Sequence, residues 1–146
     1  MGLNPDAVEA RFREINEALI DLRGLLGKDF EELSVHERMS MRYLVIQLVE
    51  AAASTSVHLL SRLFDERAEG YADCFRRLGE RKVVAEGLAE RLASAARLRN
   101  LLVHRYWEID DRRVYSSIEE GVEDFEVFKR DVRSFIDEAA SERRTG

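Results

Sequence analysis

Apolar residues recur every three to four positions along most of this chain of 146 residues, and only one proline interrupts it. This spacing places apolar side chains on one face of an α-helix, and a proline in a helix interior would break the pattern. The single proline, Pro5, stands at the start of the first such segment, where proline is well tolerated. With 36% charged residues and only eight glycines, the sequence predicts an all-α protein folded as an up-and-down bundle of four to five helices.

Capping signals and breaks in the apolar pattern bound the expected helices. The first helix begins at Pro5 and ends before Gly27, and Ser34 with Glu37 forms a capping box before the second helix, which continues to Phe64. We expect the remaining helices over residues 71–79, 86–107 and about 118–139, and a frayed tail over 142–146. Residues 1–146 are predicted to form a single domain.

The middle of the second helix, residues 51–56, contains only small side chains. Another helix could approach closely there, either within the bundle or from a second copy. Its most apolar region, residues 43–60, is interrupted by polar residues, and the N-terminus lacks the pattern of a signal peptide. Cys74 is the only cysteine and cannot form an internal disulfide, which fits a reducing cytoplasm. Together, these features predict a soluble cytoplasmic protein with no membrane segment.

The fourth predicted helix carries the residues best suited to chemistry. Arg99 occupies a position on its apolar stripe where a leucine is expected, after Leu88, Leu92 and Ala95. A buried arginine costs desolvation energy unless it meets an anion, so its presence requires a specific reason. Arg99 could pair with a carboxylate such as Glu50, or it could bind the phosphate of a substrate.

His104 lies five residues further on and could transfer protons near neutral pH. Cleavage of RNA through its 2′-hydroxyl needs a base, an acid and a cation at the phosphate, which suits His104 and Arg99. Asn100, four residues before His104, could orient the imidazole or contact the ribose. Arg99 and His104 are about 140° apart around a helix, which favours a two-fold homodimer whose site both copies complete.

The spacing R-x4-H-x-Y from Arg99 to Tyr106 resembles the signature of the HepT-like toxins of the HEPN superfamily. Three flanking segments are also similar to this family, residues 71–80, 88–92 and 106–110. The resemblance implies a HEPN-fold toxin that cleaves RNA without a metal or cofactor, with Arg99 and His104 catalytic and Asn100 supporting. It also implies a minimal nucleotidyltransferase antitoxin that transfers AMP to Tyr106, and a cleft at a dimer interface.

Two other function classes remain open at this point. One is a non-catalytic, substrate-binding subunit of a two-component nucleotidyltransferase, which would need the bundle but not an intact Arg and His pair. The other is an inert helical dimerisation module, which the arginine on the apolar stripe disfavours. A metal nuclease built on Glu108, Asp110 and Asp111 is a weaker possibility, since acids at helix ends are usually caps or solvated turns.

Charge is distributed unevenly within a net charge of −6. Residues 91–113 contain six arginines and three acids, whereas residues 114–142 contain nine acids and three bases. This segregation fits a basic groove beside an acidic helix, although both could be ordinary solvated faces. The same alternative applies to a second basic cluster, Arg76, Arg77, Arg81 and Lys82, and we expect Trp107 to pack at a helix end rather than to stack on a base.

Overall fold

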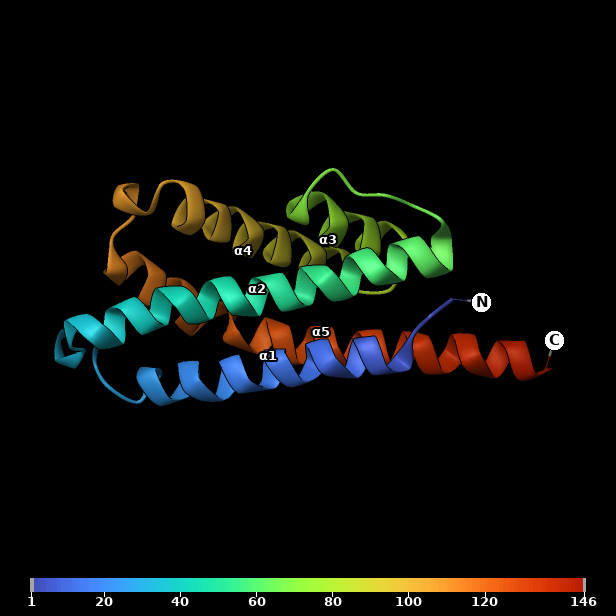
Figure 1. Ribbon diagram of the computed structural model, residues 1–146, viewed down its shortest axis with the longest axis horizontal. Helices are drawn as coiled ribbons and strands as arrows, with labels where there is room; N and C mark the ends of the chain where they lie inside the picture. The colour runs from blue at the N-terminus through green and yellow to red at the C-terminus, as the bar shows by residue number, and fades with distance from the viewer. Residues whose placement is uncertain (1, 146) are drawn as a thin grey trace.

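The computed structural model describes residues 2–145 and contains five α-helices joined by short connections, two of which include 3-10 turns (Figure 1). The elements in chain order are α1 (Pro5–Leu26), η1 (Phe30–Glu32), α2 (Val35–Phe64), α3 (Tyr71–Glu80), α4 (Glu86–His104), η2 (Tyr106–Glu108) and α5 (Asp111–Thr145). The four long helices α1, α2, α4 and α5 alternate in direction, which confirms the predicted all-α, up-and-down bundle.

The predicted signals define both ends of α1. The Asn4 side chain accepts hydrogen bonds from the backbone N–H groups of Asp6 and Ala7, Pro5 occupies the first turn, and Gly27 caps the far end. The predicted stripe faces inward, with the following residues buried: Val8, Phe12, Ile15, Leu19 and Leu22. The periodicity of the sequence therefore specifies this helix and its core face.

The capping box before α2 is also confirmed. The Ser34 hydroxyl accepts a hydrogen bond from the Glu37 N–H at 3.1 Å, and the Glu37 carboxylate accepts one from the Ser34 N–H at 3.0 Å. The small residues of α2 face the protomer's own core, since Ala52, Ala53 and Ser56 are completely buried. The suggestion that this small face receives a second copy is therefore wrong, because the bundle itself occupies it.

The short helix α3 lies along the N-terminal half of α4. The two helices approach closely at Gly79, where an added Cβ would lie 2.7 Å from the Ala89 Cβ. Because α3 is only 10 residues long, it spans about 15 Å and covers α4 only as far as Arg99. The last turn of α4 thus has an outer face without a covering helix, and Asn100, Val103 and His104 are exposed there.

Three boundaries differ from the sequence prediction. Helix α4 ends at His104 rather than near Trp107, because Arg105 leaves the helical conformation at φ −143°, ψ 44°. Helix α5 begins at Asp111, seven residues earlier than Ile118, because the Asp110 carboxylate accepts a hydrogen bond from the Arg113 N–H and caps the helix start. It then continues to Thr145, through most of the expected frayed tail, and Gly146 lies outside the described residues.

Within the described chain, α2 is the helix whose length and apolar composition would allow it to cross a membrane. More than half of its most apolar window is buried within the bundle. The core of the fold therefore accounts for the apolar character of α2.

Candidate active site

Arg99 lies half-buried between α2, α3 and α4, with 16% of its side chain exposed. Its Nη2 donates to the Glu50 carboxylate at 2.5 Å, and its Nη1 donates to the Asn100 side-chain oxygen at 3.1 Å. The guanidinium carbon lies 4.8 Å from the centre of the Tyr71 ring, at the start of α3. An anion and an aromatic face thus compensate the charge that the apolar stripe does not accommodate.

This compensation is incomplete. The Nε of Arg99 is buried and has no hydrogen-bond partner among the residues described. The Glu50 side chain is 43% exposed, so the pair opens to solvent on the Glu50 side. An anionic ligand could therefore approach Arg99 by displacing a partly solvated carboxylate.

Asn100 and His104 lie on the uncovered outer face at the end of α4, and both are exposed. The Asn100 oxygen accepts its hydrogen bond from Arg99, and no hydrogen bond joins Asn100 to His104 in the described chain. The structure thus links Asn100 to the arginine rather than to the imidazole. His104 stands free at the helix end, accessible to a proton-transfer partner.

Tyr106 is placed differently from the sequence prediction. A continuous helix would put it about 20° from Arg99 on one face, but it belongs to the 3-10 turn η2, after the helix has ended. Tyr106 is 61% exposed and Trp107 is 68% exposed, and their rings form an edge-to-face pair at 5.3 Å. The expectation that Trp107 packs at the helix end is therefore wrong.

Arg42 of α2 holds this turn in place, and the sequence analysis did not identify it. Its guanidinium donates to the Tyr106 carbonyl at 2.8 Å, to the Ile109 carbonyl at 2.6 Å and to the Asp111 carboxylate at 2.5 Å. The five N–H donors of one guanidinium can bind several acceptors of this kind at once. Sequence spacing gives no signal for these contacts, since the partners lie more than 60 residues apart.

The acids after the motif have structural partners. Asp111 pairs with Arg42, Asp110 caps α5 and Glu108 pairs with Arg105. No group of three metal-ligating side chains occurs within residues 2–145. These acids are thus the caps and solvated turns that the sequence analysis favoured for them.

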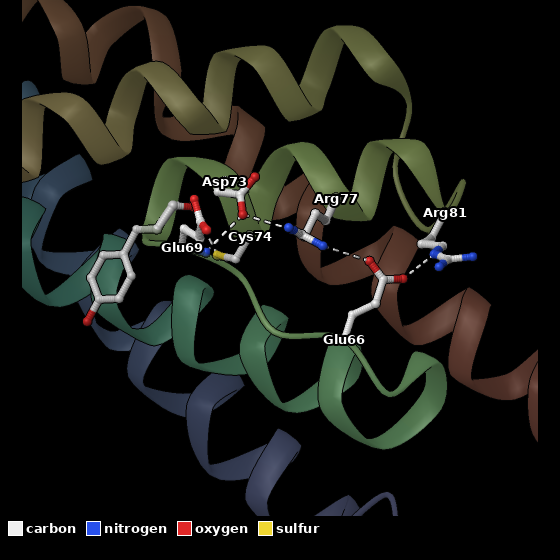
Figure 2. Close-up of polar contacts among 7 residues, drawn as sticks. Glu66, Glu69, Asp73, Cys74, Arg77 and Arg81 are labelled. Carbon is white, nitrogen blue, oxygen red and sulfur yellow. Dashed lines mark hydrogen bonds and ion pairs between the residues drawn. The ribbon is translucent and has the colours of Figure 1, made fainter.

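The basic cluster on α3 and the turn after it is largely neutralised by acids, as Figure 2 shows for two of its arginines. Glu66 bridges Arg77 and Arg81, and Asp73 also accepts a hydrogen bond from Arg77. Arg76 pairs with Glu90. This cluster is therefore a paired surface network with little free charge for a phosphate backbone.

The arginines of residues 91–113 are also mostly paired. The following arginines form ion pairs: Arg91 with Asp124, Arg99 with Glu50, Arg105 with Glu108 and Arg112 with Glu31. Among the residues described, Arg97 bonds only to the Ser94 hydroxyl, and the Arg113 guanidinium has no acidic partner. The local positive charge is thus concentrated at Arg97 and Arg113.

The other two histidines, His36 and His58, and the single cysteine have structural roles or none. The Nε2 of His58 accepts a hydrogen bond from the Asn4 N–H at 3.0 Å, and burial together with Arg62 lowers the His58 pKa below 6.5. His36 is exposed near the start of α2. Cys74 is buried and its thiol donates to the Tyr71 carbonyl, and burial raises its pKa to about 12. A thiol with such a pKa is not a nucleophile at neutral pH.

This all-α bundle, with Arg99, Asn100 and His104 in the last turns of α4, has the fold expected of a HEPN protein. The model of the family described as "Ribonuclease HepT-like" matches residues 15–132. The chain therefore belongs to the HepT-like ribonuclease family, which confirms the resemblance and the ribonuclease class inferred from the motif.

Individual relatives agree with this assignment. A curated protein of Aphanizomenon flos-aquae (strain 2012/KM1/D3), named tRNA nuclease HepT, is 26% identical over 137 residues, covering 92% of this chain and 93% of the relative. Among solved structures, the tri-AMPylated HEPN toxin of Shewanella oneidensis in complex with its MNT antitoxin superposes with a TM-score of 0.82 at 19% identity, over 90% of this chain and 99% of the toxin. The Bacillus subtilis cytosolic protein YutE, of unknown function, superposes with a TM-score of 0.83 at 18% identity, over 94% of each chain. The structural matches establish the fold.

Proposed function

We propose that the protein is the toxin of a two-component toxin–antitoxin pair and that it cleaves RNA in the cytoplasm without a resident metal. The observation that carries the proposal is the end of α4, where Arg99 is paired with the partly solvated Glu50 and where Asn100 and His104 lie on the exposed outer face. The relative named tRNA nuclease HepT supports an RNA substrate and favours tRNA within that class.

The roles follow from the chemistry of each group. Arg99 carries a permanent positive charge and would exchange Glu50 for a phosphate oxygen, stabilising the charge that develops on the phosphate in the transition state. His104 would remove the proton of the 2′-hydroxyl or protonate the leaving 5′-oxygen. Asn100, bonded to Arg99, would hold the guanidinium in place or contact the ribose.

One copy supplies one histidine to this site, His104, while the reaction uses both a base and an acid. Arg99 and His104 of one helix also lie about 140° apart, too far around the helix to converge on one phosphate. A second copy related by a two-fold axis would supply the complementary pair. The exposed apolar residues Met39 and Tyr43 on α2 and Val103 on α4 would lie in this contact.

Tyr106 would be the site of control. Its ring is exposed on η2, immediately after the motif helix, where a modifying enzyme can reach the phenol oxygen. The Shewanella toxin is tri-AMPylated and bound to an MNT antitoxin, which supports a nucleotidyltransferase partner here. An AMP group on Tyr106 would place negative charge at the end of α4, two residues after His104, and would obstruct the RNA there.

The direct test is RNA cleavage by purified His104→Ala and Arg99→Gln. Each substitution should reduce cleavage at least a hundredfold, because each removes a group that acts in the transition state. His36→Ala, at an exposed histidine outside the site, is the matched control and should cleave like the wild type. Cleavage by His104→Ala at the wild-type rate would reject the assignment.

The absence of a metal requirement is tested separately. The wild-type protein should cleave at the same rate in EDTA and in added Mg²⁺, because the proposed groups supply both charge and proton transfer. A strict dependence on added divalent cation would instead favour a metal nuclease, the interpretation built on Glu108, Asp110 and Asp111.

Assembly has its own test. Tyr43→Glu places a charge on the exposed apolar face, so it should separate the copies and lower cleavage together, with Ile20→Glu on the exposed side of α1 as the control. Light scattering and cleavage assays report both effects. A monomer with full activity would contradict the shared site.

The Arg99 and Glu50 pair supports one other function. If the ion pair with Glu50 serves only to neutralise Arg99 within the bundle, the protein would be the non-catalytic, substrate-binding subunit of a two-component nucleotidyltransferase. In that case cleavage would be absent from the wild type, and the nucleotidyltransferase partner would still bind.

A further inference from the structure

A cavity of about 480 Å³ lies between α4 and α5, on a different side of α4 from Asn100. Its apolar walls come from Leu98 and Leu101 of α4 and from Val122 and Phe125 of α5, and it reaches inward to Leu48 of α2. This volume falls within the range of about 300–1,000 Å³ that is usual for small-molecule sites.

Gly121 keeps the cavity open. It lies within α5 and lines the cavity, and a Cβ added there would meet no atom within 4 Å. Glycine destabilises a helix interior relative to alanine, and a larger side chain at this position would also fill apolar space. At this position, glycine therefore gives neither the helix propensity of alanine nor the packing of a larger apolar side chain.

The polar groups at the rim are predominantly cationic. Arg97 of α4 and Arg113 of α5 line the cavity, and they are the two arginines of this region that lack a carboxylate partner among the described residues. Glu120 also lines the rim, whereas Asp124 is already paired with Arg91. Among the described residues, the rim therefore offers two guanidinium groups without a carboxylate partner against one carboxylate without a basic partner.

We propose that the cavity binds a small amphipathic anion, with a ring or short chain in the apolar interior and a carboxylate, sulfonate or phosphate held by Arg97 and Arg113. Guanidinium groups bind such oxyanions through paired hydrogen bonds. This site is separate from the proposed catalytic groups, and the inference does not depend on ribonuclease activity.

Two fluorescent probes test the proposal on the full-length protein. The anionic probe is 8-anilinonaphthalene-1-sulfonate, and the neutral probe is N-phenyl-1-naphthylamine, which has the same ring system without the sulfonate. We expect saturable binding of one anionic probe per chain, and weaker binding of the neutral one. Absence of saturable anionic binding by the folded wild type would overturn the proposal. It would favour instead a cavity that is filled by side chains of a partner protein.

Three substitutions separate the apolar and ionic contributions. Gly121→Phe should abolish binding of both probes by filling the cavity. Arg97→Gln combined with Arg113→Gln should weaken anionic binding about tenfold or more and leave neutral binding unchanged. Glu120→Gln should tighten only the anionic probe, because it removes the one opposing charge.

Arg130→Gln, at an exposed arginine of α5 outside the cavity, is the control and should change neither probe. Circular dichroism verifies that each variant is folded. Unchanged probe binding by Gly121→Phe, or equal weakening of both probes by the double arginine variant, would refute the assignment.

An NMR titration provides a readout that needs no variant. The anionic probe should shift amide resonances of residues 94–101 and 117–125, which border the cavity. Shifts concentrated instead at the exposed Met39 and Tyr43 would show adsorption to the apolar surface and would overturn the proposal.

Discussion

Substitution of Arg42 tests how α2 fixes the turn that carries Tyr106. The Arg42→Gln substitution removes the positive charge and the N–H donors of the guanidinium. Three acceptors then lose their donor: the Asp111 carboxylate and the carbonyls of Tyr106 and Ile109. The Tyr106 carbonyl is exposed and can bind water instead. The Ile109 carbonyl and the Asp111 carboxylate are partly buried, so their losses contribute most of the cost.

The expected loss is about 2–3 kcal/mol in the free energy of unfolding, from one partly buried ion pair and one partly buried charged hydrogen bond. For a domain of this length, 1 kcal/mol shifts Tm by about 3–4 °C, which predicts a decrease of roughly 6–12 °C. Arg112→Gln is the control, because both contacts of this arginine, the ion pair with Glu31 and the cation–π contact with the Phe30 ring, involve a highly exposed side chain. It should lower Tm much less than Arg42→Gln does.

Thermal unfolding followed by circular dichroism at a fixed protein concentration measures both variants. The functional counterpart is the proposed AMP transfer to Tyr106. Its rate, followed by mass spectrometry, should fall in Arg42→Gln because the turn is no longer held. A Tm change smaller than about 2 °C in Arg42→Gln, or an equal change in Arg112→Gln, would refute the argument that this guanidinium holds the turn.

Three further predictions concern single side chains. Cys74 should resist alkylation in the native protein at about pH 8 and react after denaturation, because burial raises its pKa to about 12; rapid native labelling would contradict this. The pKa of His58 is lowered below 6.5 in the folded state, so the unfolded chain binds more protons and the stability should fall as the pH decreases below about 6.5. The His58→Gln variant should show a weaker pH dependence of Tm. An identical pH profile of Tm in both proteins would exclude this role of His58. Glu50→Gln removes the anion that competes for Arg99 and should tighten RNA binding roughly threefold to tenfold in a filter-binding assay, whereas weaker binding would mean that Glu50 serves to position the guanidinium.

Local patterns of the sequence predict the helices whose boundaries are set locally. Asn4, Pro5 and Gly27 bound α1, and the Ser34 capping box starts α2, because these residues act on the backbone within a few positions. The start of α5 had a comparable signal in Asp110, a good N-cap residue, but the apolar pattern drew the prediction to Ile118. The end of α4 had no local signal, since Arg42 stabilises the turn after it from 64 residues away along the chain.

The candidate site likewise combines features that the sequence predicts with contacts that it does not. Periodicity located Arg99 on the apolar stripe and indicated that it needs an anionic partner, and Glu50 was among the partners considered. Periodicity could not place Tyr71 over the guanidinium, because that contact depends on where a separate short helix lies. It also put Tyr106 on the face of Arg99, an error that follows directly from extending α4 by one turn too many.

The partial compensation of Arg99 connects the stability of the bundle to its proposed chemistry. A leucine at this position would pack without a partner, whereas the arginine depends on Glu50, Asn100 and the Tyr71 ring and still leaves its Nε without a hydrogen bond. A fully enclosed ion pair would hold the arginine permanently, because separating buried charges is costly. Glu50 is instead partly solvated, so a phosphate can replace it at modest cost. The same arrangement that makes an arginine tolerable in the apolar stripe therefore keeps its charge available to a substrate.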